Sequence, residues 1–190
     1  MSAAGRPLQT TPDQWVEAAL GEIEEHGVEG LAVQSVARRL GVSKGGFYHH
    51  FADRRALLRA ALALWEERFV TALAARFDAI GDPRRRLRGL LHHATVELEP
   101  TIILRLMAAA DDPDVAATLA RGADGRLSLL ERIFSELGLA PQEAQNRAML
   151  AYSAYLGLAQ LRTQAPWVLD RAGRVEAYLG DVERALIHDL

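Results

Sequence analysis

The amino-acid sequence predicts an all-α protein, and three observations lead to this fold class. Apolar residues recur at the spacing of amphipathic helices, glycine and proline separate these periodic stretches, and the alternating patterns of strands are missing. The chain has 190 residues, of which 49% are hydrophobic and 25% charged. This length and composition suit a packed core in one domain or in two small ones, and we expect about nine helices.

The first helix is expected to begin after Thr11. Pro12 takes the first helical position and Gln14 follows three residues after the threonine, which is the pattern of a capping box. Gly27 is expected to end this helix, because glycine commonly follows a helix C-terminus. The apolar stripe between these ends consists of Trp15, Ala19 and Ile23.

Two short helices and a longer one follow. Residues 33–40 carry an apolar stripe that ends at Gly41. Ser43 is expected to cap a third helix over residues 43–50, and Asp53 is expected to cap the fourth. Three helices thus fall within 40 residues, the second and third joined by a short glycine-containing turn, which is the plan of a helix-turn-helix.

Prolines and glycines also mark the later helix ends. The fifth helix is expected to begin at Pro83 and to end before Pro100, while Gly122 and Gly125 are expected to interrupt the seventh. The expected helices span residues 12–27, 33–40, 43–50, 54–81, 83–100, 102–110, 113–137, 141–163 and 171–187.

The last two helices predict a homodimer. Residues 144–161 are apolar on nearly every side, so a single partner surface cannot cover them. We expect core contacts on one side and a dimer interface on the other, with Gly157 permitting close approach; a monomer that buries everything internally is the alternative. The final helix carries a single stripe, formed by Val175, Leu179, Val182 and Leu186.

Composition excludes several classes of protein. Cysteine is absent, so the chain has no disulfides, thiolate nucleophile or thiolate metal ligand. No apolar stretch approaches the roughly 18 residues of a membrane-spanning helix, and the start lacks the layout of a signal peptide. We therefore expect a cytoplasmic protein without membrane contact.

Charge is distributed unevenly in a chain whose net charge is −3. Residues 1–30 carry six acidic side chains and one basic one, whereas residues 31–60 carry six basic side chains and one acidic one. The second segment favours a confined face for a polyanion, although an ordinary solvated face would give the same count. Lys44, the only lysine in the chain, lies in this segment.

The third helix has the features of a helix that reads DNA. Such a helix enters a major groove about 12 Å wide, so its outer side must be small and polar while its inner side is anchored. The expected inner residues are Val42, Phe47 and Phe51. The expected outer strip, from residues four apart, consists of Lys44, Gly45, Tyr48 and His49. The glycines at 45 and 46 would let the backbone approach a duplex.

The run GVEGLAVQSVARRLGVSKGGFYHHFADRRALL, residues 27–58, resembles the TetR/AcrR family of transcriptional regulators, and its core LGVSKGGFYHHF is the specific part of the match. The resemblance implies a homodimeric repressor that binds a palindromic double-stranded DNA operator and leaves it when a small-molecule effector binds. It implies neither an enzyme nor a cofactor. Repression versus activation stays open. The implied parts are a flexible arm over residues 1–10, a helix-turn-helix domain over 11–58, and an effector-binding and dimerisation domain over 59–190.

The family pattern also implies site residues. The expected DNA-binding set is Ser43, Lys44, Gly45, Gly46, Tyr48, His49 and Arg54, the last standing where the family usually has a phosphate-binding lysine. Ala32 departs from the pattern, because a threonine or serine usually caps the second helix there and its loss costs about 1 kcal/mol. Gly46 replaces a commoner serine, threonine or alanine. We expect an altered operator preference and a softer DNA-binding domain.

The resemblance places an effector pocket among the fourth to eighth helices. Candidate lining residues are Trp65, Phe69, His93, Glu97, Arg105, Met107, Tyr152 and Tyr155, each of which also suits an ordinary core position. Their aromatic and methionine content favours a mainly apolar effector, with Arg105 or His93 available for a carboxylate or hydroxyl.

Two alternatives stay open. His92, His93 and Glu97 lie on one helix, and the last two are four residues apart, a spacing that can hold a divalent metal in a metal-sensing regulator. Such residues are more often a hydrogen-bonded interior histidine and a solvated pair, and they could also line an effector cavity. The other alternative is a small all-helical enzyme or binding protein that uses the helix-turn-helix as a scaffold. The arginines at 84, 85, 86 and 88 are expected on a solvated face or at an interdomain contact.

Overall fold

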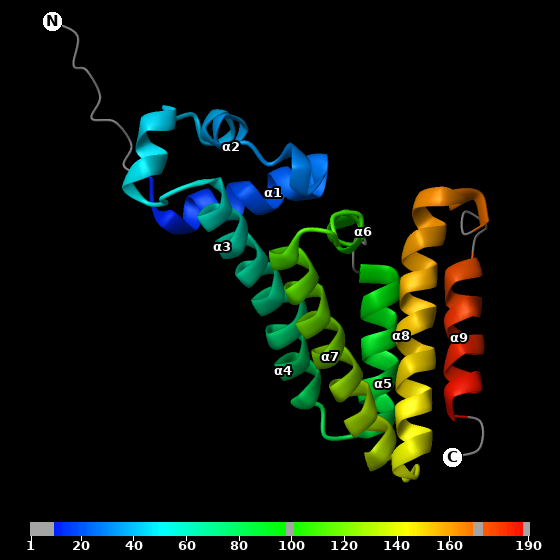
Figure 1. Cartoon of the computed structure of the whole chain (residues 1–190). Helices are drawn as coiled ribbons and strands as arrows, with labels where there is room; N and C mark the ends of the chain where they lie inside the picture. Colours follow the sequence, from blue (N-terminus) through cyan, green and yellow to red (C-terminus); the bar gives the residue numbers. More distant parts are fainter. Residues whose placement is uncertain (1–9, 98–100, 169–172, 188–190) are drawn as a thin grey trace, which may run out of the picture. The chain divides into compact units, whose positions relative to one another are not determined.

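The computed structural model describes residues 10–97, 101–168 and 173–187, and within these ranges the chain folds into helices without strands (Figure 1). The all-α expectation is confirmed. No helix in the described ranges is long and apolar enough to cross a membrane. The chain forms two compact units, one from the described residues up to Glu67 with Arg105–Leu119, the other from Arg68–Leu104 with the described residues after Leu119. The first unit therefore extends beyond residue 58 and includes a segment from the middle of the chain.

The first unit begins as the capping pattern predicts. Helix α1 (Pro12–Gly30) starts with a complete capping box, in which the Gln14 N–H donates to Thr11 Oγ1 at 3.3 Å and the Thr11 N–H donates to Gln14 Oε1 at 2.9 Å. The expected end at Gly27 is wrong. Gly27 has a φ of 76° and kinks the helix, but the chain resumes helical geometry to Gly30.

Helix α1 packs against α2 (Val33–Leu40) and α3 (Arg54–Glu66), and the 3-10 helix η1 (Lys44–His49) contacts α2 (Figure 1). Asp53 caps α3 as predicted, accepting from the Ala56 N–H at 2.7 Å. The N-cap of α2 is Ala32, which makes no side-chain bond. The buried core of these elements contains Trp15, Ala19, Ile23, Val36, Phe47, Leu57, Leu58 and Leu62.

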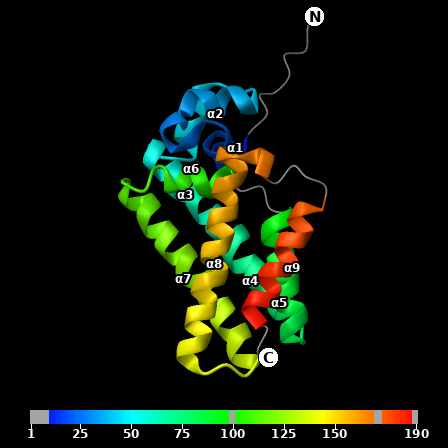
Figure 2. The same cartoon turned by 90° about the vertical axis from the view of Figure 1, so that its right-hand side faces the viewer.

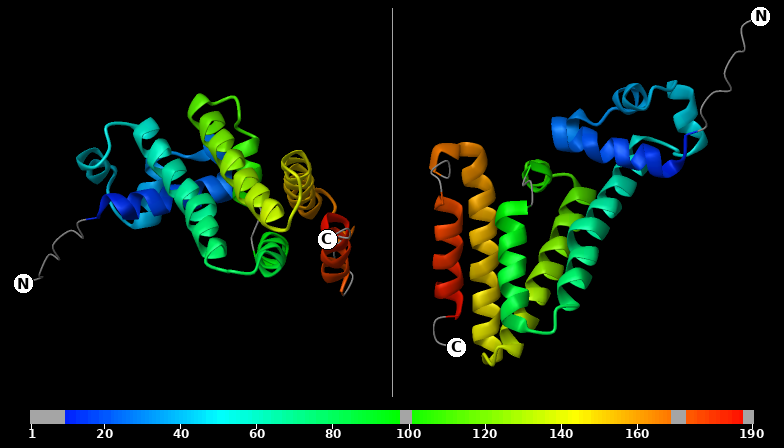
Figure 3. Two further views of the ribbon diagram at one scale, coloured as in Figure 1. Left: turned by 90° about the horizontal axis from the view of Figure 1, so that it is seen from below. Right: turned by 180° about the vertical axis from the view of Figure 1, so that it is seen from behind.

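Among the described residues, five helices contribute to the core of the second unit. Figures 2 and 3 show the ribbons of these helices from further directions. The remaining elements are η2 (Glu67–Thr71, π-helical), α4 (Ala72–Asp78), α5 (Pro83–His92), η3 (His93–Glu97, π-helical), α6 (Thr101–Met107), α7 (Pro113–Glu136), α8 (Pro141–Gln164), η4 (Pro166–Val168, 3-10) and α9 (Arg174–Ile187). The core side chains of α4, α5, α7, α8 and α9 include Phe77, Leu87, Ile133, Phe134, Ala148 and Leu186.

Helix α7 runs without a break, so the expectation that Gly122 and Gly125 interrupt it is wrong. Gly125 has a packing role instead. A Cβ at this position would lie 2.6 Å from Val70 Cγ1, which no real Cβ contact allows. The missing side chain therefore lets α7 approach η2 closely.

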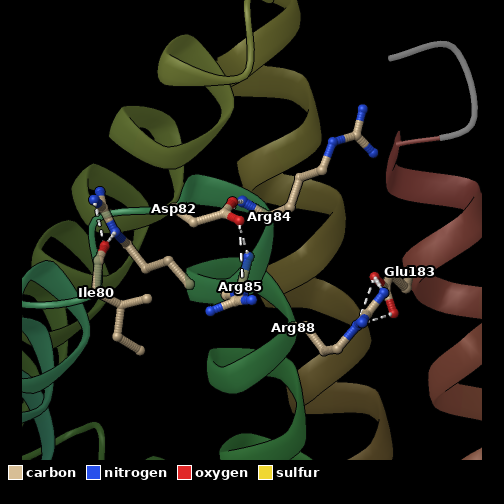
Figure 4. A network of polar contacts seen from close by, with 7 residues as sticks. Ile80, Asp82, Arg84, Arg85, Arg88 and Glu183 are labelled. Carbon is tan, nitrogen blue, oxygen red and sulfur yellow. Dashed lines mark hydrogen bonds and ion pairs between the residues drawn. The ribbon is translucent and has the colours of Figure 1, made fainter.

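Two of the arginines at the start of α5, Arg86 and Arg88, hold parts of the second unit together; Figure 4 shows the contact of Arg88 with Glu183. Asp82 caps the helix by accepting from the Arg84 N–H at 2.9 Å. Arg86 is buried and donates from Nε and Nη2 to the carbonyl of Ile80 at 3.0 and 2.9 Å. Arg88 donates to both carboxylate oxygens of Glu183, at 2.7 to 3.1 Å, and so ties α5 to α9. Arg86 and Arg88 therefore stabilise the second unit.

Candidate nucleic-acid interface and ligand cavity

The turn between α2 and η1 is a Schellman motif. Gly41 takes the left-handed conformation, with φ 69° and ψ 26°. Its N–H donates to the Arg38 carbonyl at 3.1 Å, and the Val42 N–H donates to the Ala37 carbonyl at 3.0 Å. These bonds close α2 and direct the chain into η1, and only glycine adopts this φ without strain.

One aromatic side chain anchors η1. Phe47 is fully buried, and its ring centroid lies 5.5 Å from that of Trp15 and 5.6 Å from that of Phe51. Tyr48 packs edge-on against the same ring, with centroids 5.1 Å apart, but remains 59% exposed. The inner side of η1 thus belongs to the core, and an aromatic side chain stands on its outer side.

The third helix differs from the expected α-helix over residues 43–50. It is a 3-10 helix, its characteristic bonds run from the Gly46 N–H to Ser43 and from the His50 N–H to Phe47, and Ser43 provides no side-chain cap. Two adjacent glycines disfavour α-helix by up to about 1 kcal/mol each, which accounts for the tighter and less regular turn. Because a 3-10 helix repeats every three residues, Gly45 and Tyr48 share a face, whereas residues four apart do not.

Most of the expected DNA-binding residues are exposed. Ser43, Lys44, Gly45, Tyr48 and His49 are exposed, and Gly46 is half-buried beside Trp15. We call the five exposed residues, Ser43, Lys44, Gly45, Tyr48 and His49, the η1 face.

Arg39 does not belong to this surface. It donates from Nε to Glu22 Oε1 at 2.8 Å and contacts Glu25 Oε2 through Nη2 at 2.5 Å. Hydrogen bonds with Glu25 and then Glu22 raise the pKa of Arg39, and the bond with Arg39 is the main cause that lowers the pKa of Glu25. The guanidinium therefore joins α2 to α1 and is neutralised there.

Arg54 has a different role from the expected phosphate contact. It donates from Nε to the Leu31 carbonyl and from Nη2 to the Val28 carbonyl, both at 2.5 Å. These carbonyls lie at the C-terminal end of α1, where backbone acceptors lack helical partners. The geometry thus assigns Arg54 to closing α1 and does not support a phosphate contact.

Asp114 engages two further basic residues of the segment. Arg55 donates from Nε to Asp114 Oδ2 at 2.7 Å, a bond that raises the pKa of Arg55, and Arg59 lies 4.0 Å from the same oxygen. Arg38 and Lys44 are exposed, and neither has a charged partner in the part of the chain that the structure describes. Arg38 and Lys44 are thus the two basic residues of the segment whose charged groups have neither an acidic partner nor a backbone acceptor among the described residues.

The second unit contains an apolar cavity of about 50 Å³. Its walls come from η2, α4, α5, η3, α7 and α8, and they carry hardly any polar surface. The lining residues are Val70, Leu73, Leu90, Leu91, His93, Ala94, Gly125, Arg126, Leu129, Leu130, Ala151, Tyr152 and Tyr155.

Three of the eight candidate effector residues, His93, Tyr152 and Tyr155, line this cavity. The side chain of Glu97 lies outside the described residues. The other four candidates, Trp65, Phe69, Arg105 and Met107, do not line the cavity. Trp65 is buried in the first unit, and Arg105 donates there to the Glu25 carbonyl. Met107 is 43% exposed. The sequence did not predict Arg126 or the Val70–Gly125 contact as parts of the cavity wall. The contact has one signal in the sequence, a glycine within an otherwise regular helix.

Both π-helical segments border the cavity, and an arginine from another helix holds each of them. The π-helical geometry shifts the backbone pairing, and such segments are frequent at functional sites. In η2, the Phe69 carbonyl accepts from Arg126 Nη2 at 3.0 Å. In η3, the Thr95 carbonyl accepts from Arg162 Nη2. The two arginines fix the parts of the wall that depart from regular α-helix.

The histidine pair on α5 and η3 is split between two environments. His92 is exposed, whereas His93 is half-buried with its ring centroid 5.9 Å from that of Phe77. Among the residues whose side chains are described, no group of three or more histidine or acidic residues could hold a metal ion. The third expected ligand, Glu97, lies outside that set, so the metal hypothesis stays untested.

Comparison with known proteins begins with the N-terminal helices. The family described as bacterial regulatory proteins, tetR family, matches residues 16–61, which run from within α1 through α2 and η1 into α3. The HTH-type transcriptional regulator BetI of Burkholderia ambifaria is 36% identical over 83 residues, and BetI of Proteus mirabilis is 33% identical over 75 residues. These matches span about two fifths of the length of the curated relatives, 41% and 38% respectively, and 41% and 40% of this chain.

Solved structures extend the likeness to the whole chain. A transcriptional regulator from Rhodococcus sp. Rha1 is 25% identical, with a TM-score of 0.76 over 94% of this chain and 97% of that one. E. coli NemR in its reduced form is 20% identical, with a TM-score of 0.71 over 91% and 95% of the two chains, and supports the fold. Together with the geometry of the first unit, these findings show that residues 16–61 match the tetR family of bacterial regulatory proteins and that the chain has the fold of a transcriptional regulator from Rhodococcus.

Proposed function

We propose that the chain is a ligand-responsive DNA-binding transcriptional regulator, acting as a homodimeric repressor on a palindromic operator. The observation that carries the proposal is the η1 face, where Lys44, Tyr48 and His49 are exposed while Phe47 anchors the segment from inside. A short helix held in this way has the form that enters a major groove. Tyr48 and His49 are suited to base edges, whereas Lys44 and Arg38 are suited to phosphates.

The proposed dimer interface lies on the outer face of α8. Met149, Leu150 and Leu161 are 60%, 53% and 42% exposed, which is unusual for large apolar side chains on one helix. Ser153 and Gly157 are exposed between them, and a Cβ at Gly157 would meet nothing within 4 Å. This stretch of the face contains no charged residue, so a second copy can cover it without burying unpaired charge.

The role of α9 in this interface is secondary. Its apolar stripe faces inward, because Leu186 is buried and Leu179 and Val182 pack against the core. Its exposed positions include Arg174, Glu176, Asp181 and Arg184, which suit the rim of an interface.

Ligand response is proposed to pass through η2. Val70 lines the cavity, and η2 follows α3 in the chain without an intervening loop. A molecule that enlarges the cavity must displace its walls, and displacement of η2 acts on the helix that ends the DNA-binding domain. The effector must bind the two conformers unequally, since otherwise no population shift occurs. Two recognition segments must lie about 34 to 36 Å apart to enter successive major grooves. A dimer in which the effector changes this distance would leave the operator.

Salt titration of DNA binding tests the proposal. The wild-type protein should bind a duplex from the region flanking its own gene, and log Kd should rise linearly with log salt. Lys44→Ala should lower the slope by about 0.9 per copy without lowering Tm. Arg54→Ala should lower Tm and leave the slope unchanged, because its bonds are to α1 carbonyls. Absence of binding at low salt would favour a helix-turn-helix that serves only as a scaffold.

Sedimentation tests the dimer separately. Leu161→Glu should shift the protein to monomer at micromolar concentration, because it places a charge in an apolar interface. Ala117→Glu, at an exposed position of α7 in the first unit, should leave the dimer intact. A wild-type monomer, or a dimer that tolerates Leu161→Glu, would contradict an interface on α8.

A further inference from the structure

One side chain of the cavity wall carries a polar atom that the fold leaves unsatisfied. The Tyr155 hydroxyl is buried and has no hydrogen-bond partner, which holds for no other side-chain atom in the described part of the chain. Buried hydroxyls are normally paired, and an exception calls for an explanation. Here the hydroxyl belongs to a side chain that lines the cavity, so a molecule inside it is the available partner.

The chemistry of this hydroxyl fixes the kind of partner. Burial raises the pKa of Tyr155 above its ordinary value, although the nearby Arg126 partly opposes this shift. The hydroxyl therefore stays protonated at neutral pH and can donate to an acceptor oxygen. A neutral carbonyl or ether oxygen meets this need at the least desolvation cost, because the rest of the wall is almost entirely apolar.

The arginine of the wall, Arg126, is already engaged by the protein itself. Arg126 donates from Nη1 to the Gly122 carbonyl at 3.1 Å and from Nη2 to the Phe69 carbonyl at 3.0 Å, so both terminal nitrogens serve the frame of the wall. No aspartate or glutamate is among the described lining residues, so a cation would find no countercharge there. Either charged form would also lose its hydration.

The size of the cavity limits the ligand. Its volume of about 50 Å³ is well below the roughly 150 Å³ of an apolar cavity that holds benzene. A one-ring molecule must therefore displace parts of the cavity wall. At the Val70–Gly125 contact, α7 and η2 already touch without spare room, so entry of a ring requires these two elements or their neighbours to move.

We propose that this cavity binds a small, neutral, largely apolar molecule of about one ring, whose acceptor oxygen takes a hydrogen bond from Tyr155. The inference rests on the proposed function, of which it specifies the ligand class.

Four one-ring probes of similar size test it on the full-length protein without DNA: acetophenone, ethylbenzene, benzoate and benzylamine. Calorimetric titration should give acetophenone the lowest Kd. Tyr155→Phe should weaken acetophenone about two- to tenfold, the effect of one neutral hydrogen bond, and should leave ethylbenzene unchanged. Tyr178→Phe, at a half-buried tyrosine of α9 that does not line the cavity, is the matched control and should leave both unchanged.

Tyr155→Phe should fold, because it removes an unsatisfied hydroxyl and keeps the ring; its Tm relative to wild type checks this. Tighter binding of benzoate or benzylamine than of acetophenone would overturn the ligand class. Equal acetophenone affinity in Tyr155→Phe and wild type would overturn the hydroxyl's role, and binding of none of the probes would overturn the site. The titration contains no DNA, so it tests the cavity separately from the regulatory function. If acetophenone binds here but leaves the operator affinity unchanged in a separate DNA-binding assay, this inference is supported while the proposed ligand response is contradicted.

Discussion

Replacing Gly45 by alanine is expected to stabilise the folded protein and weaken its operator complex. Gly45 does not have a positive φ, and a Cβ there would lie 3.7 Å from Ser43 Oγ, an ordinary contact. Alanine restricts the unfolded chain more than glycine does, so the free energy of unfolding should rise by about 0.4 to 1 kcal/mol. For a chain of this length Tm should increase by roughly 1 to 4 °C.

The effect on DNA follows from exposure. Gly45 shares the outer side of η1 with Tyr48, so an added methyl group would separate the backbone from the duplex. Loss of one close contact should raise Kd for the operator roughly tenfold, which corresponds to about 1.4 kcal/mol. Fluorescence anisotropy with labelled operator at a single fixed salt concentration measures this change, and calorimetry measures Tm.

Gly46→Ala provides the matched control. Its Cβ would lie 3.9 Å from Trp15 Cζ2, so the methyl group would point to the core and not to the duplex. We expect a similar gain in Tm with little change in operator affinity. If both alanines strengthened DNA binding, a more rigid η1 would matter more than backbone approach, and the proposed role of the glycines would be refuted.

Three further predictions follow from packing and charge. Gly125→Ala should lower the free energy of unfolding by about 1 to 3 kcal/mol by overpacking against Val70, and Val70→Ala in the same chain should recover part of this loss in urea unfolding. Arg86→Ala should cost about 2 to 4 kcal/mol in the same assay, because its buried bonds to a carbonyl and a carboxylate are lost. Glu25→Gln should be less stable than wild type above about pH 4.5, and this difference should vanish as pH falls through the lowered pKa that Arg39 gives Glu25.

Local signals predicted helix starts well. The Thr11 and Asp53 caps are confirmed because a cap depends on residues within three positions of it, all visible in the sequence. Ser43 looks like the same signal but makes no cap bond, since the two glycines after it favour a 3-10 turn. Local sequence thus predicts a cap reliably where a regular helix follows.

A distant contact explains why the predicted helix break at Gly125 was wrong. Whether Gly125 ends a helix or permits close packing depends on Val70, which is 55 positions earlier in the chain. The same holds for charge, because Arg55 is neutralised by Asp114, 59 residues away. A count of basic residues cannot separate cations that bind a partner from cations that hold the fold together.

The limited charge of the η1 face has a consequence for how operators are recognised. Arg38 and Lys44 are the exposed basic residues of the segment whose charged groups have neither an acidic partner nor a backbone acceptor in the described part of the chain. A homodimer would neutralise about four phosphates through them, for a salt slope near 3.6. Electrostatic attraction of this size supports weak binding to any duplex. On the proposed function, specific binding would therefore depend on base contacts from Tyr48 and His49 and on two copies engaging together. An effector that only changes the spacing between the copies would then release the operator without touching the η1 face.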